Sequence, residues 1–227
     1  MTADPCAIRG VEAVIFDMDG TLVDSEPFTA VSVEDLLVAE GIEDPELDPT
    51  GFYGRTWQAI SDELIVRHPQ LAGRCSPDLL DARFLQCWRL SPPPPIPGAL
   101  VALAAAKACG PTALATSSHR SAVDALMAQL DLGRWLDVVV SAEDFSRSKP
   151  DPECFLLAAA RLGVAPQACL VFEDSLAGLQ AARSAGMQAV AITHRTADID
   201  RARALSNLAV PDYRGLPADF FARSRAQ

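Results

Sequence analysis

Two aspartates stand two residues apart directly after an apolar run near the start of the chain. Residues 11–16 (VEAVIF) are followed by Asp17-Met18-Asp19-Gly20-Thr21. If the run is extended, residues two apart point to the same side, so both carboxylates can hold one cation. The same pentapeptide could also be a polar turn without chemistry, and the choice between the two depends on the other motifs.

Polar residues also follow two later apolar runs. Thr116-Ser117-Ser118 comes after TALA, and Glu173-Asp174 comes after CLVF. Hydroxyls and free backbone N–H groups at the start of a helix suit a bound phosphate, although Ser and Thr are also common helix caps. Two adjacent acids repel each other unless a cation lies nearby, so the acidic pair favours a metal site with oxygen ligands.

Lys149 is one of only two lysines in the chain, and prolines follow it in the sequence SKPDP. A lysine held in this way can neutralise both a carboxylate and a phosphate oxygen. The alternative is an ordinary surface lysine. Lys107, the other lysine, falls within a helical pattern and is expected to be solvated.

The elements that would position these residues are short apolar runs separated by helical patterns. This alternation predicts a doubly wound α/β fold with a parallel sheet, in which ligands bind beyond the carboxyl ends of the strands. Gly133 and Gly186 follow helical stretches, where a left-handed cap residue is expected. The predicted strands are residues 11–16, 112–115, 137–140, 169–172, 189–192 and 208–210, and the helices lie near 98–109, 121–131, 152–162 and 176–185.

Residues 26–97 break the alternation with a purely helical pattern. Helices are predicted to start at Pro27, after the cap residue Thr56 and after the cap residue Ser76. A proline-rich stretch then leads back to the core as a stiff spacer. The sequence therefore predicts a core made of residues 1–25 and 98–227, with a helical cap domain of residues 26–97 inserted into it.

Taken in order, the motifs resemble the four signature motifs of the haloacid dehalogenase superfamily, and the resemblance covers nearly the whole chain. The helical insert further resembles the subgroup that contains phosphoglycolate phosphatase and β-phosphoglucomutase. The residues that carry the resemblance are Asp17-Met18-Asp19-Gly20-Thr21, Thr116, Lys149-Pro150 and Glu173-Asp174.

The resemblance implies a role for each matching residue. Asp17 would be the nucleophile that forms an aspartyl-phosphate, and Asp19 the acid and base. Thr116 and the Ser117 backbone would hold the phosphoryl group, with Lys149 beside it. Mg²⁺ would be bound by Asp17, the Asp19 carbonyl oxygen and Asp174, with Glu173 supporting it directly or through water.

In related proteins the cap segments face the substrate, which makes Arg55 a candidate clamp for an anionic group. An exposed arginine without such a role is the alternative. Tyr53 and Trp57 are further candidates to line the pocket, although a tryptophan is also a common core residue of a cap.

The resemblance implies a Mg²⁺-dependent phosphatase that opens and closes its cap over a small phosphorylated metabolite, of the sugar phosphate or phosphoglycolate type. A phosphomutase of the β-phosphoglucomutase type is the alternative. In those proteins a histidine lies ten residues after the second aspartate, and here that position is Thr29. A dehalogenase would lack Asp19, a phosphonoacetaldehyde hydrolase would need a cap lysine that residues 26–97 do not have, and a non-catalytic relative would usually have lost a motif residue.

The amino-acid composition narrows the range of possible binding partners. Of the 227 residues, 49% are hydrophobic and 22% charged, which is typical of a folded protein. The formal net charge of -11 argues against nucleic acid and anionic membranes as partners. With no secretion signal and no apolar run of membrane-spanning length, we expect a cytoplasmic protein, a monomer or weak homodimer. Six cysteines without a CxxC pair indicate free thiols and no zinc site.

Overall fold

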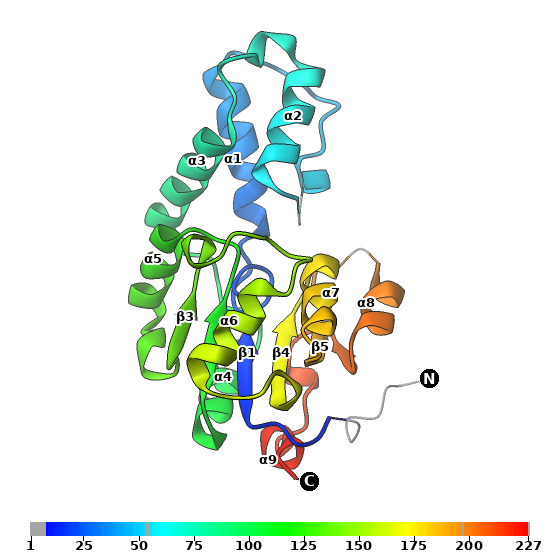
Figure 1. Ribbon diagram of the computed structural model, residues 1–227. Coiled ribbons are helices and arrows are strands. Elements are labelled where there is room, and N and C mark those ends of the chain that lie inside the picture. Colours follow the sequence, from blue (N-terminus) through cyan, green and yellow to red (C-terminus); the bar gives the residue numbers. More distant parts are fainter. Residues whose placement is uncertain (1–7, 53–54, 197, 227) are drawn as a thin grey trace. The chain divides into compact units, whose positions relative to one another are not determined.

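The computed structural model describes residues 8–52, 55–196 and 198–226, and Figure 1 shows its course. Its chain divides into two compact units, Met1–Asp24 with Pro95–Gln227, and Ser25–Pro94. Tyr53 lies outside the described residues. Within the described part of the chain, no helix is long and apolar enough to cross a membrane.

The first unit is built on one six-stranded sheet with the order β3-β2-β1-β4-β5-β6. All five neighbouring pairs are parallel, which confirms the predicted doubly wound fold. The central strand is β1, and it runs only from Ala13 to Phe16 because its first two expected residues precede the ladder. The other strands are β2 (Thr112–Ala115), β3 (Val138–Val140), β4 (Cys169–Glu173), β5 (Gln188–Ile192) and β6 (Leu208–Val210).

The strand register places the polar motifs at one edge of this sheet. Phe16, the last residue of β1, is opposite Leu114 of β2 and Phe172 of β4. Just beyond, the Asp17 N–H donates to the carbonyl oxygen of Phe172 at 3.0 Å. The three segments that follow β1, β2 and β4 therefore leave the sheet side by side.

Helices cover the sheet where the helical patterns predicted them. They are α4 (Ala99–Cys109), α5 (Arg120–Leu130), α6 (Glu153–Leu162) and α7 (Leu176–Ser184). Two further helices, α8 (Ile199–Leu205) and α9 (Phe220–Ser224), were not predicted, because seven and five residues are too few to show a helical period.

The sequence predicts left-handed glycines after two helices, and the structure confirms only one of them. Gly186 is left-handed as expected, with φ +73°. The prediction for Gly133 is wrong, because Asp131 adopts the left-handed conformation at the end of α5, with φ +49°. Aspartate is one of the few residues besides glycine that tolerates this region. Gly133 lies instead within the short 3₁₀ turn of Leu132–Arg134.

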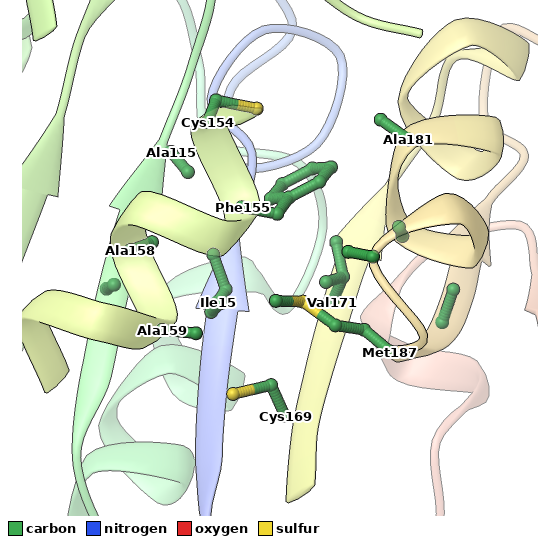
Figure 2. Close-up of a cluster of buried hydrophobic side chains, with 14 of the residues drawn as sticks. Ile15, Ala115, Cys154, Phe155, Ala158, Ala159, Cys169, Val171, Ala181 and Met187 are labelled. Carbon is green, nitrogen blue, oxygen red and sulfur yellow. The ribbon is translucent and has the colours of Figure 1, made fainter. Parts of the chain in front are cut away.

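The two faces of the sheet are packed with side chains of different size. Figure 2 shows one face, where Ile15 and Val171 meet mainly small residues of α6 and α7, and Phe155 is the one aromatic ring among the buried residues of this cluster. Because successive strand residues point to opposite faces, Phe16 and Phe172 lie on the other face. Their rings stack at 5.0 Å, and Phe172 also stacks on Tyr213 at 5.3 Å. Stacked aromatic rings on this second face of the sheet thus hold the carboxyl ends of β1 and β4.

The second unit contains α1 (Glu26–Ala39), α2 (Trp57–Arg67) and α3 (Pro77–Leu90), and each of these helices starts within one residue of its predicted start. The predicted cap residues Thr56 and Ser76 accept the N–H groups of Ala59 and Leu79, both at 3.2 Å. These helices enclose a core of their own, formed mainly by leucines and isoleucine. Trp57 packs edge-on against Phe84 within this unit and donates its indole N–H to Asp81 at 3.2 Å.

Candidate active site

Lys149 lies buried at the carboxyl edge of the sheet, with its side chain only 8% exposed. Its Nζ is 2.6 Å from Asp17 Oδ1 and 2.8 Å from Glu173 Oε1. The ammonium group also lies 4.7 Å from the centre of the Phe155 ring. The alternative of an ordinary surface lysine is therefore wrong.

The loop before α6 delivers this lysine to the site. Glu153, in the first turn of α6, accepts the backbone N–H groups of Ser146 at 3.2 Å and Arg147 at 3.0 Å. The peptide bond between Lys149 and Pro150 is cis. Glu153 thus anchors the loop before α6 and thereby positions Lys149, two residues after Arg147, with its ammonium group at the sheet edge.

Three carboxylates gather at this edge of the sheet, and two of them, Asp17 and Glu173, contact the ammonium group. Oxygen atoms of Asp17, Glu173 and Asp174 lie within 4.8 Å of one another. One lysine against three acids leaves two negative charges when all are ionised, which is the charge that a single divalent cation balances. The donor set consists of carboxylate oxygens, the ligands that Mg²⁺ prefers. The residues therefore fit a divalent cation.

Burial and neighbouring charges together set the pKa values of Asp17 and Lys149. It raises the pKa of Asp17 to about 7, although the charge of Lys149 acts in the opposite direction. Burial would lower the pKa of Lys149, but the charges of Asp17 and Glu173 outweigh it and raise that pKa above its usual value. Lys149 consequently stays protonated at neutral pH. Asp17 needs positive charge in addition to that of Lys149 to be fully ionised at this pH.

Hydrogen bonds from neighbouring groups fix Glu173, the last residue of β4, and Asp174, which follows it. The Thr21 hydroxyl donates to Asp174 Oδ1 at 3.0 Å, and the Thr196 hydroxyl donates to the Asp174 carbonyl oxygen at 2.9 Å. The Ser175 N–H donates to Glu173 Oε2 at 2.6 Å. Thr196 had no signal in the sequence, because it stands outside every motif.

Two glycines leave room for these acids. A Cβ atom at Gly178 would lie 1.7 Å from Glu173 Oε1, and one at Gly20 would lie 2.2 Å from Asp174 Oδ2. Gly20 also has φ +71°, a backbone conformation that other residues rarely adopt. A larger residue at Gly178 would displace the Glu173 carboxylate, and one at Gly20 would displace the Asp174 carboxylate and strain the backbone.

The Thr116-Ser117-Ser118 segment lies at the same edge. Thr116 is buried and its hydroxyl oxygen accepts the Ser118 N–H at 3.0 Å, whereas Ser117 is exposed. The Ser118 hydroxyl donates to the carboxylate of Asp19. Asp19, which is half-buried, is thereby tied to the segment proposed for phosphate binding.

The expectation of free backbone N–H groups at the following helix is wrong for Arg120. Helix α5 starts at this residue, and its N–H donates to both carboxylate oxygens of Glu143, at 3.1 and 3.0 Å. A carboxylate of the chain itself thus occupies the helix N-terminus. His119, the residue before α5, is exposed.

Arg55 belongs to the helical unit and is exposed. Its Nη1 is 2.7 Å from Glu63 Oε2, and its guanidinium lies 5.3 Å from the centre of the Phe52 ring. Its role as a substrate clamp stays a prediction.

The chain is similar to proteins of a known family. Residues 11–186 match the family described as haloacid dehalogenase-like hydrolase. The chain belongs to this family. Among relatives of this haloacid dehalogenase-like hydrolase, the fructose-1-phosphate phosphatase YqaB of Escherichia coli (strain K12) is 33% identical over 182 residues, which are 78% of this chain and 94% of that protein.

Two more similarities have a narrower meaning. The protein SUPPRESSOR OF QUENCHING 1, chloroplastic, of Arabidopsis thaliana is 35% identical over 80% of this chain, but the chain spans only 18% of that protein's length. The crystal structure of a β-phosphoglucomutase from Clostridium difficile has a TM-score of 0.73 and 22% identity, over 94% of this chain and 96% of that chain. At that identity it shows the shared fold alone.

Proposed function

We propose that this hydrolase is a Mg²⁺-dependent phosphatase that acts on a small phosphorylated metabolite, such as a sugar phosphate, through an aspartyl-phosphate on Asp17. The observation that carries the proposal is the buried Lys149, held between Asp17 and Glu173 at the edge where Thr116 and Asp19 also lie. A site of this kind suits an oxyanion whose charge must be neutralised.

The first step of the proposed reaction uses both aspartates. One oxygen of Asp17 attacks phosphorus, a new P–O bond forms on its carboxylate, and the bond from phosphorus to the substrate oxygen breaks. Asp19 gives its proton to that leaving oxygen, so that an alcohol departs. The Ser118 hydroxyl, which donates to the Asp19 carboxylate, orients this acid.

The second step returns the enzyme to its starting state. Asp19, now ionised, takes a proton from a water molecule whose oxygen attacks phosphorus, and the bond to Asp17 breaks with release of phosphate. Throughout, Lys149 stays protonated because two carboxylates flank it, and its ammonium group faces the phosphoryl oxygens. Thr116 and the Ser117 backbone would hold those oxygens in place.

Asp17, the Asp19 carbonyl oxygen and Asp174 would hold Mg²⁺, with Glu173 in support. When bound, the ion would supply neutralising charge to the transferring phosphoryl group. The hydroxyl of Thr21 and the space left by Gly20 keep the Asp174 carboxylate directed toward the other acids.

The substrate class rests on the relatives. YqaB is named for a sugar phosphate, and this chain covers nearly all of its length. We assign substrate selection to the helical insert of residues 26–97. Hydrolysis is favoured over mutase chemistry because Thr29, buried in α1, stands where β-phosphoglucomutase-like proteins have a histidine.

A screen of phosphorylated metabolites with Mg²⁺ present tests the proposal. Free phosphate should be released from at least one sugar phosphate, scored by kcat/KM. A parallel reaction should contain a sugar 1-phosphate and a catalytic amount of the bisphosphate, followed for both phosphate and the 6-phosphate isomer. Efficient formation of the isomer with little phosphate release would overturn the phosphatase proposal in favour of a mutase.

A further inference from the structure

Both aspartates proposed to react stand on one tightly hydrogen-bonded turn. The Met18 carbonyl oxygen accepts the N–H groups of Leu22 at 2.8 Å and Val23 at 3.1 Å, and the Gly20 N–H donates to the Val23 carbonyl oxygen at 2.8 Å. Asp24 is the last residue of the first unit before the chain continues into the helical unit at Ser25. What holds Asp24 therefore holds the far end of this turn.

The side chain of Asp24 is held by Arg195. The Arg195 Nε donates to Asp24 Oδ1 at 2.6 Å and its Nη2 donates to Asp24 Oδ2 at 2.7 Å, a bidentate pair. The Asp24 side chain is only 14% exposed. His194 Nε2 lies 3.4 Å from the same carboxylate. Burial would raise the pKa of Asp24, but the hydrogen bonds and charge of Arg195 keep it below the usual value.

The same loop also reaches the acidic cluster. Arg195 follows β5, and the next residue, Thr196, donates to the carbonyl oxygen of Asp174. Two successive residues thus hold the turn that carries Asp17 and Asp19 and the segment that carries Asp174. An isolated exposed ion pair contributes little, but this one is bidentate and connects two parts of one site.

We propose that Arg195 is a positioning residue for phosphoryl transfer: by binding Asp24 it fixes the end of the Asp17–Asp24 turn relative to Asp174. This inference rests on the proposed function. The role of Arg195 is indirect, because it acts through the carboxylate of Asp24. A small displacement of a reacting group can cost orders of magnitude in rate, so the effect should appear in kcat.

The experiment compares three variants of the full chain in a phosphate-release assay. Arg195→Ala removes the pair, Arg195→Lys keeps the charge but loses the bidentate geometry, and Arg203→Ala is the matched control. Arg203 pairs with Asp200 in α8, with side chains 64% and 95% exposed, so its loss changes the net charge equally away from the turn.

Arg195→Ala should lower kcat about tenfold with KM within about twofold, because the effect is on alignment and not on substrate binding. Arg195→Lys should recover part of the loss, and Arg203→Ala should match the wild type. Equal kcat for Arg195→Ala and Arg203→Ala would overturn the inference. If Arg195→Ala does not fold, Arg195→Lys decides alone, and a wild-type kcat in that variant counts against the bidentate pair.

Amide hydrogen exchange separates this inference from the proposed function, because it needs no turnover. Amides of Leu22 and Val23 should exchange faster in Arg195→Ala than in the wild type or Arg203→Ala. If the wild type hydrolyses no phosphate ester, the proposed function fails whatever the exchange shows. Unchanged exchange at these amides contradicts the positioning role even in an active enzyme.

Discussion

The sheet edge of the first unit and the helical unit hold their cations differently. Lys149 is buried between two carboxylates, whereas Arg55 is an exposed arginine paired with Glu63, whose side chain is 48% exposed. Burying charges carries a desolvation cost that well-packed apolar residues would avoid, while an exposed pair is close to neutral for stability. A role in the reaction therefore explains the buried charges around Lys149 better than a role in stability does. In the exposed pair, Arg55 can exchange Glu63 for another anion at little cost in stability.

The largest effect should come from Asp17→Asn. The amide keeps the shape of the side chain and removes the nucleophile, so kcat should fall by at least about 10³-fold. Phosphate release measures the loss, and an unchanged circular dichroism spectrum shows that the fold is intact. Wild-type turnover in this variant would refute the mechanism.

Removal of divalent metal should come next. With EDTA the activity should fall to about a tenth or less, and added Mg²⁺ should restore it, because the acidic cluster otherwise keeps excess negative charge beside the phosphoryl group. The assay is repeated with Asp174→Asn, whose Mg²⁺ requirement should shift to higher concentration. Full activity of the wild type in chelator contradicts the assignment of Asp17, Glu173 and Asp174 as a metal site.

Lys149→Ala should lower kcat about 10²-fold, since it removes one preorganised donor for the phosphoryl oxygens. The matched control is Lys107→Ala, which removes the only other lysine. Lys107 forms an ion pair with Asp137 at the surface, with side chains 33% and 39% exposed, so the control should stay within about threefold of the wild type. A similar small effect for both lysines would remove the contrast between buried and exposed cations.

Arg55→Ala tests the helical unit. If Arg55 leaves Glu63 to bind an anionic group of the substrate, the variant should raise KM about fivefold with kcat nearly unchanged. The rise is modest because the hydrogen bond that Arg55 gains to the substrate is partly offset by the loss of its pair with Glu63. Arg74→Ala, which breaks an exposed pair with Glu40 in the same unit, is the control. An unchanged KM assigns Arg55 to the surface.

The smallest expected effect concerns stability. The pKa of Asp17 in the folded, metal-free protein is about 7, above its unfolded value of 3.8. Its contribution to stability is therefore fully present below about pH 3.8 and is lost as the pH rises through about 7. In chelator, Asp17→Asn should have a higher Tm than the wild type at pH 8, by about 2–4 °C for each kcal/mol of difference in the free energy of unfolding. The difference in Tm should vanish near pH 4. A constant difference across this range would show that Asp17 does not titrate this way.

Much of the fold could be predicted because its signals are local. Runs such as TALA and CLVF are strands buried on both faces, and Thr56 and Ser76 cap helices through their own side chains. The motif residues meet because parallel strands end at one edge. A short helix such as α8 gave no period to detect.

Contacts between distant residues could not be predicted. Nothing near Arg120 in the sequence indicates that Glu143 occupies the start of α5, and nothing near Asp24 points to Arg195. The left-handed Asp131 was missed because a nearby glycine was the stronger local signal. Candidate site residues could thus be proposed from their motifs, but their supporting partners depend on the folded chain.

The central position of β1 has a consequence for how the protein is made. Of the six strands of this sheet, β1 is synthesised first, yet Val14 must pair with Thr112 on one side and Leu170 on the other. The nascent chain therefore carries the apolar strand before Asp17 without its β4 neighbour until the residues of β4 have left the ribosome, while the intervening helices, with mostly local contacts, can form earlier. We expect truncated chains that end before β4 to aggregate, because their central strand keeps one open edge.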